Sequence, residues 1–142
     1  MAENGFQSAC TYIYDPAILL RLTSSTFQAE YKNGVKPLNP GENLKLRPLC
    51  LEDYDKGYLQ LLSQLTSVGD VTREQFEDRF NKMKACDDTY YITVIEDLTS
   101  KQVIGSATLV KEQKFIHGST ARARVEDVVV SDSCRGKQLG KV

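Results

Sequence analysis

Two neighbouring carboxylates stand inside an apolar run near the end of the 142-residue sequence: Glu126 and Asp127, in the segment 125–130. Successive side chains of a strand point to opposite faces, so one of the two has to face a buried or cleft side. Burying an ionised carboxylate without a partner is costly, so the position indicates a hydrogen-bonded or functional group. The alternative is that Glu126 pairs with Arg124 on one face and Asp127 lies at a bulge or strand end.

A turn of glycines and cations follows that strand directly. This order of elements, a strand followed by a glycine-containing loop and the start of a helix, directs backbone N–H groups and the positive end of the helix dipole toward one point. Such a point suits the binding of a pyrophosphate. The order is neither that of a Walker loop nor GxGxxG. A basic surface turn capped by glycine would look the same. The turn consists of Arg135, Gly136, Lys137, Gln138, Leu139, Gly140 and Lys141.

The composition and the net charge of the chain limit the classes of function that it can have. With 41% hydrophobic and 26% charged residues, the chain has the composition of a folded globular domain. A net charge of −1 gives no field that would favour nucleic acid as the main partner. Residues 111–142, however, hold seven basic and four acidic side chains, which favours a small anionic ligand there.

Targeting signals and metal-ligand patterns are missing from the sequence. The N-terminus has no secretory pattern and no apolar run is long enough to span a membrane, so we expect a cytoplasmic protein, with peripheral association with internal membranes left open. The four cysteines have no CxxC spacing and His117 is the only histidine, so we expect reduced thiols and no metal.

Hydrophobic periodicity predicts the elements that position these residues, in an α+β fold. A strand over 44–49 precedes a helix capped by Asp53, whose apolar stripe runs to Leu65. Thr72 and Gln75 form a capping box for a second helix, which places Phe76, Phe80 and Met83 on one apolar face. Strands over 89–96, 103–115 and 121–130 follow, with connections too short for crossover helices, so serial antiparallel pairing is expected. We divide the chain into a flexible N-terminal arm (1–42) and a domain (43–142).

The carboxylate strand and the glycine turn together resemble the GNAT (Gcn5-related) acetyltransferases. Their pyrophosphate loop has the pattern Gln/Arg-x-x-Gly-x-Gly/Ala, which Arg135 opens here and in which Gln138 replaces the first glycine. LRPL at 46–49, YYITVIED at 90–97, KFIH at 114–117 and RVEDVVVSDSCRGKQLGK at 124–141 further resemble the glucosamine 6-phosphate N-acetyltransferases of animals.

This resemblance implies transfer of acetyl from acetyl-CoA to the amine of D-glucosamine 6-phosphate, on the way to UDP-N-acetylglucosamine, by a homodimer with no metal. It assigns Gly136 to Lys141, opened by Arg135, to acetyl-CoA. Glu126 and Asp127 become the catalytic pair, one orienting the amine and the other removing its proton through water. Residues expected to contact the sugar phosphate are Thr66, Lys114, Phe115, Ile116, His117, Glu126, Asp127 and Val128.

Members of that family continue beyond the point where this sequence ends, so we expect a GNAT fold whose C-terminal part is missing. Two other functions therefore stay open. One is an inactive remnant that only pairs with full-length subunits, and the other is a GNAT enzyme acting on a different amine, such as a peptide N-terminus.

Overall fold

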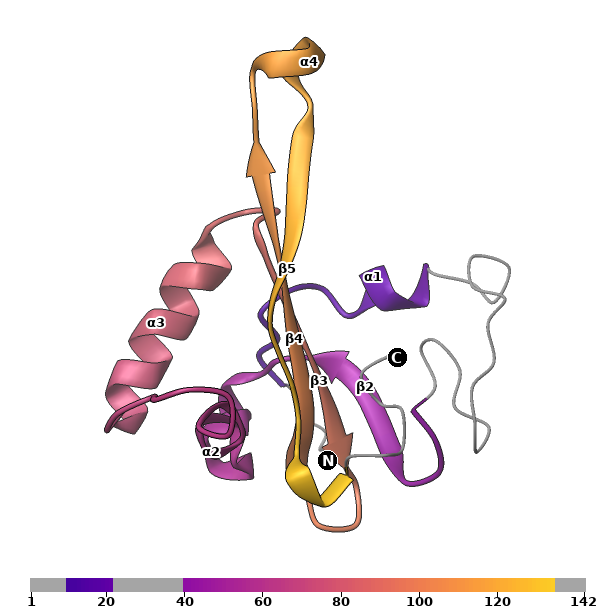
Figure 1. The fold of residues 1–142 in the computed structure, drawn as a ribbon, viewed down its shortest axis with the longest axis vertical. Coiled ribbons are helices and arrows are strands. Elements are labelled where there is room, and N and C mark those ends of the chain that lie inside the picture. Colours follow the sequence, from indigo (N-terminus) through magenta and orange to yellow (C-terminus); the bar gives the residue numbers. More distant parts are fainter. Residues whose placement is uncertain (1–9, 22–39, 135–142) are drawn as a thin grey trace, which may run out of the picture.

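The computed structural model describes residues 10–21 and 40–134, and its centre is a four-stranded antiparallel sheet in the order β2-β3-β4-β5 (Figure 1). The serial antiparallel pairing expected from the sequence is confirmed. The strands are β2 (Leu44–Pro48), β3 (Tyr90–Asp97), β4 (Gln102–Gln113) and β5 (Ala121–Val130).

All the described helices except α3 (Arg73–Ala85) are short. Between residues 53 and 65 the structure differs from the single helix predicted from the sequence. Gly57, at φ 80°, separates the 3-10 helix η2 (Leu51–Lys56) from α2 (Tyr58–Leu62). A positive φ is cheap only for glycine, so the chain turns there instead of continuing one long helix. The single capped helix predicted over this stretch is therefore wrong. The other helices are α1 (Ala17–Leu20), α3 (Arg73–Ala85), α4 (Ile116–Ser119) and η3 (Asp132–Cys134).

Helix α3 begins at the predicted capping box. The Gln75 N–H donates to Thr72 Oγ1 at 3.2 Å, and the Thr72 N–H donates to Gln75 Oε1 at 3.0 Å. These two bonds satisfy backbone donors that a helix start otherwise leaves unpaired. Phe76 and Phe80 are buried one turn apart, so the predicted apolar face is confirmed.

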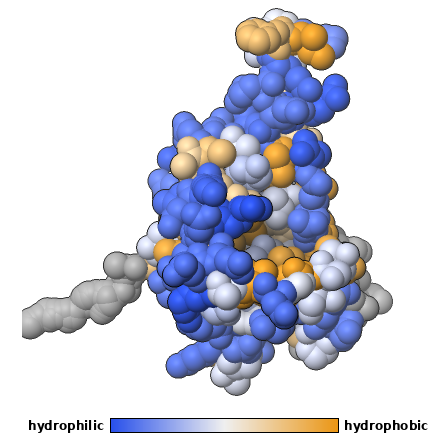
Figure 2. Space-filling model, turned by 90° about the vertical axis from the view of Figure 1, so that its left-hand side faces the viewer, coloured by the Kyte–Doolittle hydropathy of each residue, from blue (hydrophilic) through white to orange (hydrophobic). Residues whose placement is uncertain are grey.

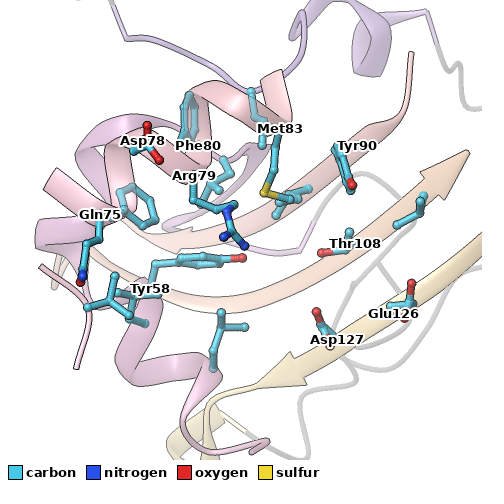
Figure 3. A pocket seen from close by; sticks show the side chains of 18 of the residues that line it. Tyr58, Gln75, Asp78, Arg79, Phe80, Met83, Tyr90, Thr108, Glu126 and Asp127 are labelled. Atoms are coloured by element: carbon cyan, nitrogen blue, oxygen red, sulfur yellow. The ribbon is translucent and has the colours of Figure 1, made fainter. Parts of the chain in front are cut away.

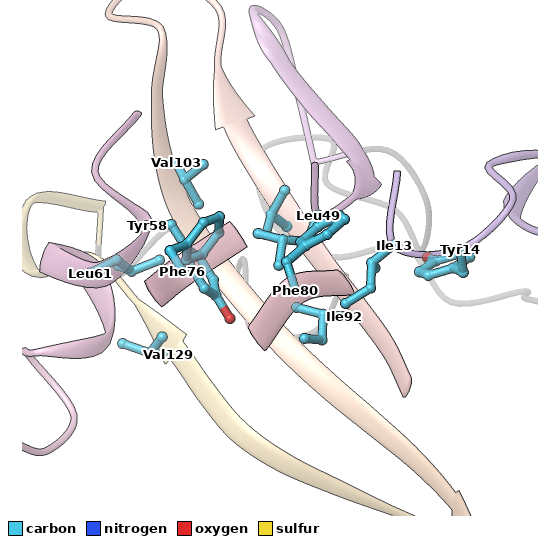
Figure 4. Close-up of a cluster of buried hydrophobic side chains, with 11 residues drawn as sticks. Ile13, Tyr14, Leu49, Tyr58, Leu61, Phe76, Phe80, Ile92, Val103 and Val129 are labelled. Atoms are coloured by element: carbon cyan, nitrogen blue, oxygen red, sulfur yellow. The ribbon is translucent and has the colours of Figure 1, made fainter. Parts of the chain in front are cut away.

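The main core lies where α2 and α3 cover one face of the sheet (Figures 1 and 4). Phe80 and Val94 are almost fully enclosed there, at 2% and 0% exposure. The N-terminal segment adds Ile13, whose N–H donates to the Leu49 carbonyl at 2.8 Å. Thus part of the expected arm packs into the core, while the division at residue 42 itself stays a prediction. The buried cluster is Ile13, Tyr14, Leu49, Tyr58, Leu61, Phe76, Phe80, Ile92, Val94, Val103 and Val129.

A buried ion cluster fastens η2 to the sheet. Arg47 donates through both terminal nitrogens to Asp53, at 2.8 and 2.6 Å, and through Nε to Glu96 at 3.1 Å. Lys56 donates to the other Glu96 oxygen at 3.0 Å, and the Cys50 N–H donates to Asp53 at 2.9 Å. Asp53 is therefore not the N-cap of one long helix: it lies within η2, where its carboxylate accepts the Cys50 N–H in a capping box and also binds the buried guanidinium.

The β4–β5 hairpin extends beyond the body of the molecule and carries α4 at its tip (Figure 1). Its stem is hydrophilic and hydrophobic side chains gather at the tip (Figure 2), where Phe115 is 96% exposed. Among residues 10–21 and 40–134, no helix is long and apolar enough to cross a membrane.

Candidate active site

The carboxylate pair lies at a bulge in β5. Ser106 of β4 pairs with Val129, whereas Thr108, two residues further on, pairs with Glu126. Two residues of β5, Asp127 and Val128, are therefore opposite Ala107 alone, and Asp127 adopts a left-handed φ of 53°. Such an extra residue bends the strand and re-aims the side chains beside it.

The bulge changes the orientation that simple alternation predicts. Glu126 and Asp127 both line one cleft of about 690 Å³ between α3 and the sheet, and both point into it from β5 (Figure 3). The expectation that they face opposite sides is wrong, since the extra residue shifts the strand's alternation by one position. A cleft of this volume falls within the usual range of small-molecule sites.

Glu126 has a partner on its own strand. Arg124 Nε lies 2.7 Å from Glu126 Oε2, and both side chains are about half exposed, at 55% and 46%. The same-face ion pair considered from the sequence is therefore present, together with the bulge at Asp127. An exposed pair of this kind contributes little to stability, and the carboxylate stays open to the cleft.

The opposite wall of the cleft provides a hydroxyl and a cation. Burial, together with the negative charges of Asp127 and Asp53, raises the pKa of the Tyr58 hydroxyl to about 12, so this group is a neutral hydrogen-bond donor or acceptor at ordinary pH. Arg79 extends from α3 toward the Tyr58 ring (Figure 3). Thr108 and Tyr90 add polar atoms from the sheet.

Sequence reasoning did not identify Tyr58 or Arg79 as cleft residues. Tyr58 belongs to the apolar stripe of the predicted helix, where a tyrosine is read as core. Arg79 lies three residues after Phe76 and four after Gln75, which places it on the edge of the buried face of α3. This helical spacing is the signal from which its position could have been inferred.

The KFIH segment is not part of this cleft. Lys114 ends the stem of the hairpin, paired with Glu112 at 3.0 Å, and Phe115 and Ile116 are exposed at the tip. His117 adopts a φ of 51° within the turn. Lys114 lies six positions beyond Thr108, the pairing partner of Glu126, which corresponds to roughly 20 Å of extended chain, so the tip is remote from the carboxylates.

The remaining predicted site residues are placed as follows. Thr66 is exposed after α2, where its N–H donates to the Leu62 carbonyl at 3.2 Å, and it does not line the cleft. Val128 is 47% exposed and also lies outside the cleft lining. The acetyl-CoA segment 135–141 lies outside the described residues.

This fold is that of the GNAT acetyltransferases, as predicted. A crystal structure of a GNAT family acetyltransferase from Staphylococcus aureus matches with a TM-score of 0.55 at 19% identity, covering 70% of each chain, which supports the fold alone. The crystal structure of glucosamine-6-phosphate N-acetyltransferase from Arabidopsis thaliana matches with a TM-score of 0.68 at 41% identity, covering 70% of this chain and 68% of that one.

Curated relatives identify the family. The chain is 55% identical over 133 residues to the probable glucosamine 6-phosphate N-acetyltransferase of Drosophila melanogaster, covering 93% of this chain and 60% of that protein. It is 41% identical over 100 residues to the Arabidopsis thaliana enzyme, covering 70% of this chain and 67% of that protein. The chain belongs to the glucosamine 6-phosphate N-acetyltransferase family. No protein-family model matches it, and it spans 60% of the length of the Drosophila relative.

Proposed function

We propose that this chain carries the amine-acceptor cleft of an enzyme that transfers acetyl from acetyl-CoA to D-glucosamine 6-phosphate, giving N-acetyl-D-glucosamine 6-phosphate. One observation carries the proposal: in a chain of this family, the β5 bulge directs Glu126 and Asp127 into the same cleft. Acetyl-CoA is the co-substrate that GNAT acetyltransferases use.

The cleft chemistry suits an amino sugar. The substrate amine is an ammonium in water, so one carboxylate, Asp127, holds it while Glu126 takes its proton through a water molecule. The freed nitrogen attacks the thioester carbonyl, a C–N bond forms, and collapse of the tetrahedral intermediate breaks the C–S bond and releases the CoA thiolate. A backbone N–H of the segment from Val128 to Val130 would stabilise the developing oxyanion. No covalent enzyme intermediate is required.

The sugar phosphate needs cations, and the chain offers two sources. Arg79 lies on the cleft wall, where its planar guanidinium suits a phosphate. Lys114 and His117 lie at the hairpin tip, so a contact with the same phosphate requires a second copy of the chain. This arrangement supports the proposed homodimer. Light scattering tests the dimer directly.

The acetyl-CoA assignment and the cellular location extend the proposal. We assign the pyrophosphate to the segment from Arg135 to Lys141 through its backbone N–H groups. A cytoplasmic location of the whole protein belongs to the same proposal.

The direct test measures release of free CoA with D-glucosamine 6-phosphate and with a set of peptide amines. Turnover by the 142-residue chain alone would exclude an inactive remnant, and turnover with peptides alone would overturn the proposed substrate. Asp127→Asn removes the charge of this side chain without disturbing the backbone, because asparagine also tolerates a positive φ. We expect Asp127→Asn and Glu126→Gln each to lower kcat by about 100-fold or more.

Asp78→Asn is the matched control. Asp78 also borders the cleft, but it pairs with Lys82 on the solvent side of α3 at 3.1 Å. Its substitution should leave kcat and KM unchanged. Equal losses in all three variants would show that cleft charge in general, and not the β5 pair, determines the rate.

A further inference from the structure

The N-terminal segment pairs with the chain just after β2 in a short antiparallel bridge. Tyr12 pairs with Cys50, and the Leu51 N–H donates to the Thr11 carbonyl at 3.1 Å. In this register Cys10 is opposite Glu52, so the side chains of Cys10 and Cys50 share a face as diagonal neighbours. The two sulfurs and a Glu52 carboxylate oxygen all lie within 4.8 Å of one another.

The two thiols differ sharply in environment. Cys10 is exposed, whereas Cys50 is 1% exposed. Burial raises the pKa of the Cys50 thiol to about 12, with Asp53 adding to the rise and Arg47 opposing it. Because an external oxidant reaches an exposed sulfur more readily than a buried one, it reacts first at Cys10. Cys50 then serves as the resolving partner, with Arg47 Nη1 3.5 Å from its sulfur to stabilise the thiolate.

We propose that Cys10 and Cys50 form a redox-sensitive pair that closes to an intramolecular disulfide in the presence of a small-molecule disulfide such as oxidised glutathione. The Cys10 thiolate attacks oxidised glutathione, giving a mixed disulfide and one glutathione thiolate. The Cys50 thiolate then attacks the Cys10 sulfur and displaces the second glutathione. The two protein thiols are oxidised, the oxidant's S–S bond is reduced, and both protons end on the two glutathione molecules.

A metal ion could also bind the cluster of Cys10, Cys50 and Glu52, but the positive charge of Arg47 disfavours it. The Arg47 guanidinium contacts the Cys50 sulfur and is held there by Asp53 and Glu96, so a cation bound at this sulfur would face a fixed positive charge. Disulfide closure adds no charge. The two sulfurs already lie within 4.8 Å of each other, so closure to an S–S bond of about 2 Å requires only a small shift of the N-terminal segment.

Closure would hold the N-terminal segment on the fold. Cys10 and Cys50 are 40 positions apart in the chain, so the bond removes a large loop entropy from the unfolded state. Ile13 and Leu49, which flank the bridge, both line the cleft of Glu126 and Asp127. Oxidation would therefore stiffen one wall of that cleft, and this consequence is independent of which reaction the cleft performs.

The test oxidises the full chain in glutathione buffers of graded ratio, alkylates the remaining thiols with N-ethylmaleimide and maps tryptic peptides by mass. Cleavage at Lys45 and Lys56, with the Arg47–Pro48 bond resistant, should give a disulfide-linked pair of peptides 1–21 and 46–56. The Cys86→Ser variant, which also removes an exposed thiol, should give the same pair. Cys10→Ser should give none.

Thermal melting provides the second readout. We expect the midpoint to rise by roughly 5–15 °C on oxidation of the wild type and of Cys86→Ser, and to return with reductant. Cys10→Ser should show no rise. Linkage of Cys10 to Cys86 or Cys134, linkage only between chains, or an equal rise in Cys10→Ser would overturn the proposal. So would a one-to-one zinc complex that protects both thiols from alkylation and from oxidation.

Discussion

Replacing Asp53 by alanine should destabilise the protein more than any surface substitution, because it leaves a buried guanidinium without its main partner. Asp53 is 0% exposed and Arg47 is 5% exposed. The substitution removes both charge-assisted bonds between them, at 2.6 and 2.8 Å, and the acceptor of the Cys50 N–H. Glu96 would remain as the carboxylate partner of Arg47, and the Pro48 carbonyl and the Cys50 sulfur would still accept from Nη1, at 3.0 and 3.5 Å.

The expected loss is about 3–5 kcal/mol, the usual cost of breaking a buried ion pair from one side. Against a typical domain stability of about 5–15 kcal/mol, such a loss unfolds a substantial fraction of the molecules. Urea unfolding followed by far-ultraviolet circular dichroism measures it. The matched control is Asp55→Ala, two residues further on, whose carboxylate is exposed and pairs with Arg73. That variant should have the midpoint of the wild type.

A double-mutant cycle decides whether the ion pair itself is responsible. Arg47→Met removes the buried cation, so Arg47→Met combined with Asp53→Ala should be less destabilised than the sum of the single variants by about 2 kcal/mol or more. Strictly additive losses, or a loss below about 1 kcal/mol in Asp53→Ala, would refute the argument that an orphaned charge sets the cost.

Two further predictions concern stability. Burial raises the pKa of the Glu96 carboxyl, but Lys56 and Arg47 outweigh this and hold the pKa below its ordinary value of 4.5. Glu96 therefore contributes stability that is present above pH 4.5 and lost as the pH falls through the lower folded-state pKa. In Glu96→Gln the free energy of unfolding, measured from pH 7 to 3, should fall less steeply with falling pH than in the wild type. An unchanged slope would contradict this. Thr72→Ala should cost about 1 kcal/mol by removing the acceptor for the Gln75 N–H, whereas Thr72→Ser should restore the wild-type midpoint in urea.

Several features of the fold were determined by the sequence alone, because their causes are local. The capping bonds between Thr72 and Gln75 join residues three apart, and the spacing of Phe76 and Phe80 follows the helical period. The strands likewise follow from apolar alternation and connections too short for crossover helices. The family resemblance also rested on contiguous segments, and the relatives confirm it.

The candidate site was settled by tertiary pairing. Whether Asp127 is an ordinary strand residue or a bulge depends on its register against Ala107, which no pattern within β5 reveals. Asp53 lies within η2 and is not the N-cap of one long helix, because the chain turns at Gly57 and Arg47 of β2 binds the Asp53 carboxylate in the core. Cys10 and Cys50 meet only because the N-terminal segment pairs beyond β2. Local periodicity predicts elements, whereas contacts between elements decide where a carboxylate or a thiol points, because those contacts depend on residues far apart in the chain.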